Sequence, residues 1–579
     1  MNGYHVPVDR IMRAMHVAGL GDVLQLPPFE GIDTDAVRDV LQGFATLAEE
    51  VIAPTDREGD LHGAVLDHET GCVSVPASFH TAHAEFAKGG WTSLSAPSHL
   101  GGGGFPGVAA TATQEIFGSA NLALSLNPVL TQSAIELLER WGDDRQQGLY
   151  LRRLLDGVWT GTMNLTEPDA GSDVGAVRAV AEPLDDGRWA ITGTKIYITW
   201  GEHDLTDNII HLVLARVPGG PAGTKGISLF LVPKVMVDDE GHLLERNSVR
   251  CLSLEHKMGI NASPTCVLEF DRAIGEMVGP VHGGMAAMFS MMNPARLAIG
   301  LEGTAVSERA YQQAVDYARE RRQGRAPGWA GEGSSPIIEH PDVRRMLVSI
   351  AASIDACRLL TFATAIAADV ARYHPDAKHR VAAQRRVDLL TPLAKSFPTD
   401  QGVRNASLAV QVHGGMGFVE ETGVAQRYRD VRIAPIYEGT NGIQAIDLVG
   451  RKVARDGGAS MAELCDDIDT TVQQASAVGG LETATASLVR SLAALREATD
   501  WVVSQGGASS VDVLAGATAY QELAGAVAAG HLLIRQACDG DPVDIARATV
   551  FAVEHLDRVA LLDTVRLGAN TLAAGLGLA

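Results

Sequence analysis

The chain has 579 residues, enough for about three or four domains, and its 46% hydrophobic and 20% charged content excludes disorder on the scale of the whole chain. The 47 Lys and Arg residues against 70 Asp and Glu residues give a net charge of −23, which disfavours binding to nucleic acid or to anionic membranes. The first residues, MNGYHVPVDRIMRAMHVAGL, lack a basic stretch followed by an apolar one, and no apolar run approaches the ~20 residues that span a bilayer. We therefore expect neither a signal peptide nor a transmembrane segment.

The six cysteines are scattered and form no C-x-x-C pair, which predicts a reducing, cytoplasmic environment and argues against a disulfide framework or a zinc site. The histidines, including His203, His256 and His413, show no zinc-ligand spacing beside an acidic residue. We interpret them as structural and predict no metal site. The cysteines are Cys72, Cys251, Cys266, Cys357, Cys465 and Cys538.

Changes in sequence pattern divide the chain into four predicted domains. Residues 1–157 carry helical apolar spacing from Asp35 onward, as in AVRDVLQGFATLAEEVI, and form a predicted N-terminal helical domain. Residues 158–282 contain short β-branched or apolar runs bounded by Gly, Pro, Asp or Asn, such as KIYIT and NIIHLVLARV. Because no helix-length segment separates these runs, we expect a central antiparallel β domain.

Helical spacing returns after Gly283, and residues 283–455 are predicted to form a four-helix bundle with an exposed loop at GWAGEGSSP. Residues 456–579, the C-terminal extension, are predicted to form an extra all-helical domain. The predicted fold class is therefore α+β multidomain. One apolar stripe of the extension is expected to be core, and it consists of Leu481, Ala484, Leu488, Leu492, Leu495 and Val502.

Hydroxyl side chains follow two of the predicted strands. The segment MNLTEPDAGSD (163–173) places Thr166 and Ser172 on a Pro-containing turn, which can hold a phosphate or a flavin edge, although an ordinary loop explains it equally well. Thr199 ends a second strand, and Tyr197 lies two residues earlier on the same strand face. An aromatic ring beside a hydroxyl can support a flat heterocycle and bind its rim.

Two Gly-containing motifs follow in the helical region. VHGGMGF (412–418) has three glycines behind a predicted helix, so that the backbone can approach a ligand, or simply cap the helix. YEGTNGIQ (437–444) places Glu438 before a turn, in a run poor in charge. Apolar surroundings raise the pKa of a carboxyl group and suit a general base, whereas a Glu at a helix N-terminus is more commonly a partner of the helix dipole.

In this order, the motifs resemble those of the acyl-CoA dehydrogenase family of flavoproteins over about residues 35–452. The shared motifs are TEPDAGSD, KIYIT, ERRQGR at 320–325, QVHGGMGF and RDVRIAPIYEGTNGIQ. The segments RCLSLEHKMGI, GEHD at 201–204 and AMFSMMNPARLAIG, together with the C-terminal extension, are similar to the larger branch that includes the 3-methylmercaptopropionyl-CoA dehydrogenases.

The resemblance implies an FAD-dependent enzyme that converts an acyl-CoA thioester to the trans-2-enoyl-CoA. Glu438 would remove the α-proton while the β-hydride passes to flavin N5, and an electron-transfer flavoprotein would accept the electrons. A homodimer is also implied, because Arg321 and the 411–415 stretch would serve the neighbour's FAD. The implied FAD-binding residues are Met163, Leu165, Thr166, Gly171, Ser172, Tyr197, Thr199, Arg321, Gln411, Gly414, Gly415, Thr440 and Gln444. The implied substrate-binding residues are Ser172, Asn293, Arg296, Glu438 and Gly439.

Two positions depart from the pattern of the family. Asn293 stands where many members carry Asp, and Pro341 where many carry Gln. Three other functions stay open, because one fold hosts several chemistries: a flavin oxidase or monooxygenase, a DNA-associated flavoprotein of the alkylation-response type, and a non-catalytic flavoprotein scaffold. The charge of −23 weighs against the second, and the intact YEGT and TEPDAGSD motifs weigh against the third.

Overall fold

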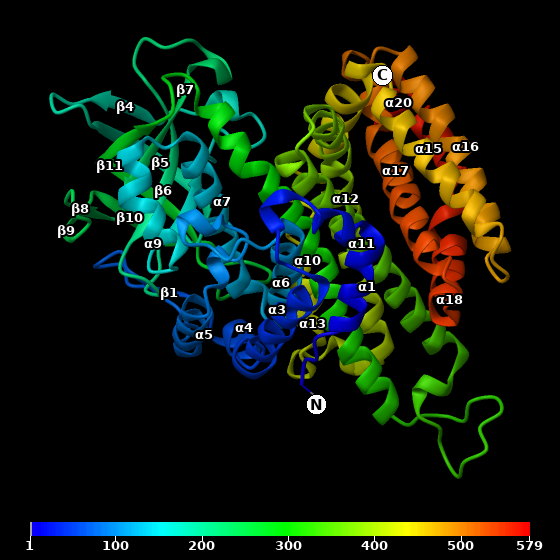
Figure 1. Cartoon of the computed structure of the whole chain (residues 1–579). Coiled ribbons are helices and arrows are strands. Elements are labelled where there is room, and N and C mark those ends of the chain that lie inside the picture. Colours follow the sequence, from blue (N-terminus) through cyan, green and yellow to red (C-terminus); the bar gives the residue numbers. More distant parts are fainter. Residues whose placement is uncertain (1–2, 579) are drawn as a thin grey trace. The chain divides into compact units, whose positions relative to one another are not determined.

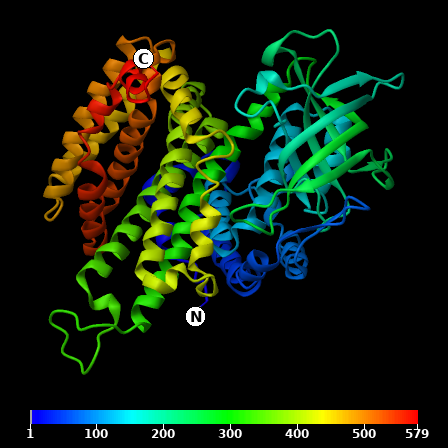
Figure 2. The same cartoon turned by 180° about the vertical axis from the view of Figure 1, so that it is seen from behind.

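The computed structural model describes residues 3–578, and their contacts divide the chain into two compact units. The sheet unit consists of Gly43–Phe105 and Ala120–Ala295, and the helical unit of Met1–Gln42, Pro106–Ser119 and Arg296–Ala579. The strands gather in the first and the long helices in the second (Figures 1 and 2). This division into two units does not test the boundaries of the four domains expected from the sequence, which stay predictions.

The elements of the sheet unit are short except for α7 and two of the strands. They are α4 (Thr55–His62), β1 (Val65–Leu66), β2 (Val73–Ser74), α5 (Ala77–Lys88), α7 (Leu122–Trp141), α8 (Asp144–Gln146), α9 (Arg152–Leu155), β3 (Thr160–Asn164), β4 (Val180–Pro183), β5 (Trp189–Thr199), β6 (Ile209–Arg216), β7 (Ile227–Pro233), β8 (Val235–Val237), β9 (Leu243–Arg246), β10 (Val249–Leu254) and β11 (Thr265–Val278).

The regular elements of the helical unit, within residues 3–578, are helices. They are α1 (Val8–Ala18), α2 (Leu20–Val23), α6 (Gly107–Ala120), α11 (Pro341–Tyr373), α12 (Ala377–His413), α13 (Val424–Val431), α14 (Asn441–Asp447), α15 (Ala459–Ala475), α16 (Glu482–Ser504), α17 (Val511–Ala537), α18 (Pro542–Phe551), α19 (Leu561–Val565) and α20 (Ala569–Gly575). Two further helices, α3 (Thr34–Leu47) and α10 (Gly284–Glu320), pass from one unit to the other.

The strand pairings of the sheet unit close into a ring. Strand β5 pairs with β4 and β11, β6 pairs with β4 and β7, and β7 pairs with the second half of β11, while β3 and β10 are attached to this ring. Each strand of the ring therefore has neighbours on both sides, which protects its edges from pairing with other chains, whereas β3 and β10 each have one partner among the described strands. The predicted β domain is thus confirmed.

The sheet differs from the purely antiparallel arrangement expected from the sequence in two pairings. Strand β3 runs parallel to β6, with Thr160 opposite Ile209, and β4 meets β6 in parallel at Val180 and Arg216. A parallel pair needs a connection of about a dozen residues or more, usually a helix. Here the β4–β5 pair itself forms the connection between β3 and β6, so no helix-length segment is needed.

Strands β6 and β7 of the ring are buried on both faces, and alternation along them divides their side chains between two cores. On β6, Leu212 and Leu214 belong to the core that α7, α9 and the first turns of α10 cover, whereas Val213 and Ala215 belong to the core inside the ring. Phe230 of β7 also lies inside the ring. The two-residue period of a strand makes this division possible.

The long helices α11 and α12 of the helical unit lie side by side, and α17 of the C-terminal extension packs along both (Figures 1 and 2). Among the described residues α11 alone is long and apolar enough to span a membrane, and 89% of its apolar stretch is buried within the protein. Three long helices, α10 to α12, and the short α13 and α14 occupy the region predicted as a four-helix bundle. The predicted stripe of α16 is core, since all six side chains, from Leu481 to Val502, are at most 3% exposed.

Two elements of the N-terminal region were not apparent in the sequence. In the sequence of this region, helical spacing begins only at Asp35, whereas the structure also has α1. Arg10 of α1 donates to Asp544 of α18 at 2.7 Å and forms an ion pair with Asp355 of α11. The second is the small β1–β2 hairpin, in which Val65 pairs with Ser74. Two-residue strands are too short to produce a periodic pattern.

Candidate functional site

The TEPDAGSD turn lies against the end of β5. Strand β3 ends at Asn164, and the turn that follows is closed by the two backbone hydrogen bonds between Glu167 and Ala170. The carbonyl oxygen of Thr166 accepts a hydrogen bond from the backbone N–H of Ile196 at 2.9 Å. The two hydroxyl-bearing segments that the sequence predicts as cofactor-binding are therefore neighbours in space.

A β-bulge near the end of β5 presents Tyr197 to solvent. Lys195 is opposite Leu268 and Ile198 is opposite Cys266, so two residues of β5 face only Val267 of β11. Tyr197 adopts a left-handed backbone conformation with φ of 58°, and 60% of the residue is exposed. Large exposed aromatic rings in strained positions are uncommon in a strand and point to a function for this one.

The hydroxyl groups of Thr166 and Thr199 have no hydrogen-bond partner among residues 3–578, and both residues are partly exposed. Met163 and Leu165 are half-buried against the core of the sheet unit, and their backbone lies along the same strand end. Gly171 and Ser172 lie further along the turn and are exposed. The candidate residues of this unit thus lie on two neighbouring segments, the TEPDAGSD turn and the end of β5, which offer two unpaired hydroxyls and one exposed aromatic ring.

A buried ion pair holds the TEPD turn from below. Lys195 is fully buried and donates to the Glu167 carboxylate at 2.7 Å and to the carbonyl oxygen of Leu165 at 3.2 Å. The same carboxylate accepts the backbone N–H groups of Arg178 and Ala179 at 2.6 and 3.0 Å. Burial lowers the pKa of Lys195 to about 8, and its Glu167 partner opposes this shift. Every oxygen of Glu167 is therefore satisfied, and the turn is rigidly placed.

In the helical unit, Glu438 lies in a tight turn directly before α14. Its φ is 53°, and Gly439 follows at φ of 82°. Glycine is favoured at position 439 because its φ of 82° lies in the left-handed region, where a side chain is strained. Thr440 caps α14 by accepting the backbone N–H of Ile443 at 3.1 Å.

Two opposing effects act on the pKa of the Glu438 carboxyl group. Burial raises the pKa of Glu438, and the positive charges of Arg296 and Lys395 act in the opposite direction. Arg296 on α10 is 8% exposed, and burial lowers its pKa while Asp447 and Glu438 raise it. A carboxylate in such a setting can take up a proton and release it again.

Two polar groups of this turn point to a missing ligand. Within the described part of the chain, the backbone N–H of Glu438 has no acceptor. The Oε1 atom of Gln444 is buried and also lacks a hydrogen-bond partner, while its Nε2 lies 3.5 and 3.4 Å from the carbonyl oxygens of Glu438 and Gly439. Buried polar groups are nearly always paired, so the unpaired Oε1 of Gln444 points to a ligand that would donate to it.

Arg321 and the Gly-rich stretch after α12 lie together at one end of the bundle. Tyr317, one turn before Arg321 on α10, stacks on His413 with ring centroids 4.4 Å apart. Gln411, Gly414 and Gly415 are exposed there. Lys395, which contacts the Glu438 turn, precedes His413 by 18 residues on α12, a helical rise of about 27 Å. The structure does not bring this group of residues to Glu438.

The two departures from the family pattern have different settings. Pro341 is the first residue of α11, where its fixed φ and missing N–H fit the helix N-terminus, and the change is thus explained by helix geometry. Asn293 is exposed and precedes Arg296 by about one turn on α10, next to the helix-interior Pro294. A contact from Asn293 to a substrate stays a prediction.

Sequence reasoning missed three buried polar side chains that hold the two turns. Lys195 and Lys395 are fully buried and Glu302 is 5% exposed. Glu302 and Lys395 each interrupt an apolar run, in LAIGLEGTAV and LLTPLAKSF, and a charge inside a buried helix face is a signal that could have identified these two. Lys195 lies on β5, in TGTKIYIT, where the sequence gives no such signal. The interpretation of His203 and His413 as structural agrees with their contacts, because His203 is hydrogen-bonded to Thr160 at 2.9 Å and His413 to Ala409 at 2.7 Å.

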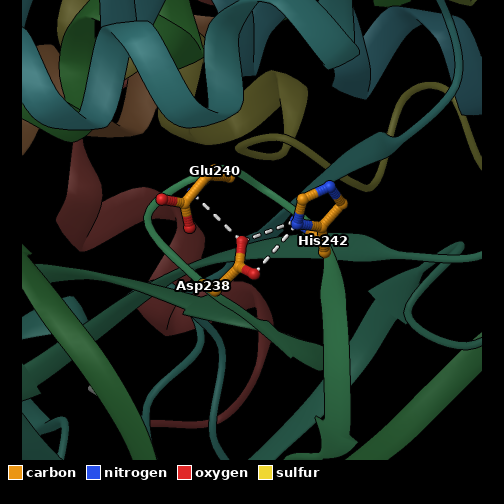
Figure 3. Close-up of side chains that lie close together, drawn as sticks. All are labelled: Asp238, Glu240 and His242. Atoms are coloured by element: carbon orange, nitrogen blue, oxygen red, sulfur yellow. Dashed lines mark hydrogen bonds and ion pairs between the residues drawn. The ribbon is translucent and has the colours of Figure 1, made fainter.

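One group of possible metal ligands occurs in the described residues, and it lies in the turn between β8 and β9 (Figure 3). Asp238 accepts the backbone N–H groups of Glu240 and His242 at 3.0 and 2.8 Å, and its other oxygen lies 3.0 Å from Nδ1 of His242. Glu240 and His242 are exposed. Turn formation therefore explains the cluster without a metal ion.

Family models match most of the chain. Residues 34–158, 162–273 and 282–453 match the models described as the N-terminal, middle and C-terminal domains of acyl-CoA dehydrogenase, and residues 464–542 match "Acetyl-CoA dehydrogenase C-terminal like". The chain is 46% identical over 532 residues to a 3-methylmercaptopropionyl-CoA dehydrogenase of Ruegeria pomeroyi, covering 92% of this chain and 90% of that protein.

Two solved structures have the same fold. Caenorhabditis elegans ACDH-11, solved in complex with C11-CoA, aligns with a TM-score of 0.81 at 19% identity, covering 99% of this chain and 95% of that chain. A Bacillus anthracis acyl-CoA dehydrogenase complexed with FAD aligns with a TM-score of 0.74 at 19% identity, covering 96% and 92% of the two chains.

Proposed function

The chain belongs to the acyl-CoA dehydrogenase family, and from this membership we propose that it catalyses the FAD-dependent α,β-dehydrogenation of an acyl-CoA thioester. The observation that carries the proposal is the Glu438 turn, where a carboxyl group of raised pKa lies next to a backbone N–H without an acceptor. A base and an oxyanion donor on one residue are what removal of an α-proton from a thioester needs.

Glu438 acts as the base. The α-proton of a thioester is weakly acidic, so the negative charge that develops on the thioester oxygen has to be stabilised as the proton leaves. The free N–H of Glu438 is suited to donate to that oxygen while the carboxylate takes the proton. The positive charges of Arg296 and Lys395 favour the ionised form of Glu438, against the effect of burial, which raises its pKa. Arg296 and Gly439 are proposed to contact the substrate.

The residues present fit FAD. In the sheet unit, the unpaired hydroxyls of Thr166 and Thr199 and the exposed ring of Tyr197 suit the rim and face of a flavin. In the helical unit, the unpaired Oε1 of Gln444 can accept a hydrogen bond from a ligand. When bound, FAD would accept the hydride that leaves the β-carbon of the substrate. The protein's part is to hold the turn through Lys195 and Glu167, so that the hydroxyls are positioned before the ligand arrives.

Several finer features belong to the same proposal. Arg321 and the 411–415 stretch would contact the FAD of a neighbouring subunit in a homodimer. They lie near the C-terminal end of α12, far from Lys395, which contacts the Glu438 turn. An electron-transfer flavoprotein would be the electron acceptor, and the protein would be located in the cytoplasm.

The name of the Ruegeria pomeroyi relative suggests a short acyl chain with a thioether, so we propose 3-(methylthio)propionyl-CoA as a substrate.

The test is an anaerobic screen. The purified protein is loaded with FAD and mixed with acyl-CoA thioesters of different length, including 3-(methylthio)propionyl-CoA, while the flavin absorbance is followed. We expect bleaching with at least one thioester and appearance of the enoyl-CoA product. Failure to retain FAD, or retained FAD that no thioester bleaches, would refute the proposal. Turnover in air without an added electron acceptor would favour the oxidase function instead.

A further inference from the structure

A second carboxyl group lies behind the Glu438 turn. Glu302 is on α10, and its carboxyl oxygens both lie 2.5 Å from the hydroxyl of Tyr437, the residue before Glu438. Glu302 is 5% exposed, and the resemblance of the sequence to its family gives it no role. This contact ties the chain on one side of Glu438 to a helix of the bundle.

Lys395 on α12 holds the turn at two more points. Its ammonium group donates to the carbonyl oxygen of Ala434 and to Oδ1 of Asn441, each at 2.8 Å. Asn441 in turn donates to Asp400 at 2.8 Å. The segment 434–441 is therefore fastened at both ends and, through Tyr437, in its middle.

This anchoring matters because Glu438 is in a conformation that it would not adopt alone. A φ of 53° is unfavourable for a residue with a side chain longer than that of Asn or Asp, and such positions persist only where the surroundings enforce them. No hydrogen bond from the Glu438 carboxyl group to another described residue holds it in place. Its position depends on the anchored backbone.

The charge state of Glu302 is compatible with this role. Burial raises the pKa of Glu302 to about 8, while the Tyr437 hydrogen bond and the charge of Lys395 lower it and the charge of Glu438 raises it. The groups that face it are Tyr437 and Glu438 from the turn and Lys395 from α12. A neutral Glu302 can hold the Tyr437 hydroxyl without adding a negative charge beside the base.

We propose that Glu302 is a positioning residue for Glu438, acting through its hydrogen bond to the Tyr437 hydroxyl. It touches neither substrate nor cofactor, and it fixes the left-handed turn so that the Glu438 carboxyl group and backbone N–H keep their relative placement. The inference rests on the proposed function of Glu438, and the experiment below separates the two.

The test compares Glu302→Leu, Glu302→Gln, Tyr437→Phe and the Glu302→Leu/Tyr437→Phe double variant as FAD-loaded proteins. Glu302→Leu and Tyr437→Phe should each slow flavin reduction by about 10- to 100-fold, because small displacements of a base are costly. The double variant should be no slower than the slower single variant, since both remove one contact. Glu302→Gln keeps an acceptor for Tyr437 and should stay within about threefold of wild type.

A stability measurement gives a readout that does not depend on turnover. An unfolded glutamate has a pKa of about 4.3, and the folded Glu302 has a pKa of about 8. Between these values the folded state holds a proton that the unfolded state has lost, so the unfolding free energy falls as pH rises across this window. Glu302→Gln should remove this contribution to the slope, and Glu302→Leu should remove it too.

Tyr150→Phe is the matched control. Tyr150 donates to Glu276 at 3.0 Å, a hydrogen bond of the same kind in the sheet unit. This variant should lose some stability without slowing flavin reduction. Flavin reduction by Glu302→Leu within about threefold of wild type, or additive losses in the double variant, would overturn the inference. If Glu438→Gln itself still bleaches its flavin, the proposed function fails and not the positioning role alone.

Discussion

At the scale of single residues, the proposed chemistry depends on the setting of one carboxyl group. Glu438 combines burial, two opposing positive charges and a backbone N–H without an acceptor, and none of these is visible in the four letters YEGT. Helix-end carboxylates commonly stabilise a helix dipole only. The left-handed backbone conformation of Glu438 is strained, and strained backbone positions are typical of functional sites.

Glu438→Gln is expected to keep FAD and acyl-CoA bound and to lose flavin reduction. The amide has a similar shape and keeps the backbone N–H, but it cannot accept the α-proton, so the rate should fall by at least about 10² to 10⁴. Rapid mixing with a reactive acyl-CoA measures this. Glu421→Gln, on an exposed glutamate of the same bundle, should behave as wild type. A Glu438→Gln rate within about threefold of wild type would exclude Glu438 as the base.

The rate of flavin reduction should rise with pH through the pKa of Glu438, because only the ionised carboxylate accepts a proton. Burial places this pKa above the ordinary value, and Arg296 opposes the shift. Arg296→Leu should therefore move the midpoint of kcat/KM against pH to a higher pH. Stopped-flow measurements across the pH range of stability give the midpoint. A shift to lower pH would contradict the assigned charge interaction.

At the scale of elements, each of the two turns is placed by a buried amine. Lys195 holds the turn between β3 and β4, and Lys395 holds the turn before α14. Each ammonium group donates to two acceptors. Burying a hydrogen-bonded lysine costs desolvation but fixes the geometry of the segment that it contacts. The same feature therefore recurs in both units.

Lys195→Met should lower the unfolding free energy by about 3–5 kcal/mol and weaken FAD retention, because it leaves the Glu167 carboxylate buried without its cation. Denaturant unfolding and the flavin content after desalting measure the two effects. Lys195→Met/Glu167→Leu should recover part of the stability. Arg178→Ala is the control, since Arg178 and Asp169 form an exposed ion pair at 3.0 Å that is worth at most about 1 kcal/mol. If Lys195→Met and Lys195→Met/Glu167→Leu lost the same unfolding free energy, the unpaired Glu167 carboxylate would not be the cause of the loss.

The apolar stripe of α16 gives a prediction for the C-terminal extension. Leu488 is fully buried, so Leu488→Ala should cost about 2–5 kcal/mol of local stability. Val489, its neighbour on the same helix, is 47% exposed, and Val489→Ala should change stability by at most about 0.5 kcal/mol. Hydrogen exchange of α15 to α17 reports this local stability. Similar exchange in both variants would mean that the stripe is not core in solution.

At the scale of the whole molecule, the proposed cofactor residues do not form one group. Arg321 and Gln411 lie at the end of α12 that is remote from Lys395 and the Glu438 turn. Residues that bind one cofactor molecule have to lie close together in space. The separation is therefore what a homodimer with shared cofactor sites would require.

Sedimentation and flavin content test the homodimer together. We expect a dimer that retains FAD, and Arg321→Ala should keep the fold while weakening FAD binding by about tenfold, the loss expected for one charge-assisted phosphate contact. Arg325→Ala is the control, because Arg325 is an exposed arginine of the same loop whose guanidinium donates to the carbonyl oxygen of Trp329 at 3.4 Å. A monomer that binds FAD tightly would contradict the shared site.

Much of the fold follows from local pattern. Alternation along KIYIT and NIIHLVLARV produces strands, and the stripe from Leu481 to Val502 produces a buried helix face, because side-chain periodicity is a property of the chain itself. The order of helical, β and helical segments, and with it the α+β class, is fixed at the same level. The parallel pairing of β3 with β6 is not, since it depends on which distant strands meet.

The candidate site divides in the same way. The motifs TEPDAGSD and YEGTNGIQ identify the two turns and the chemistry of their residues, because residue type and short spacing are encoded locally. Only the tertiary structure brings Thr166 to Ile196, Lys195 to Glu167, and Glu302 to Tyr437, because these contacts join residues from about 28 to 135 positions apart. Burial and pKa shifts arise from these long-range contacts, so the proton affinity of Glu438 is a property of the folded chain and not of its motif.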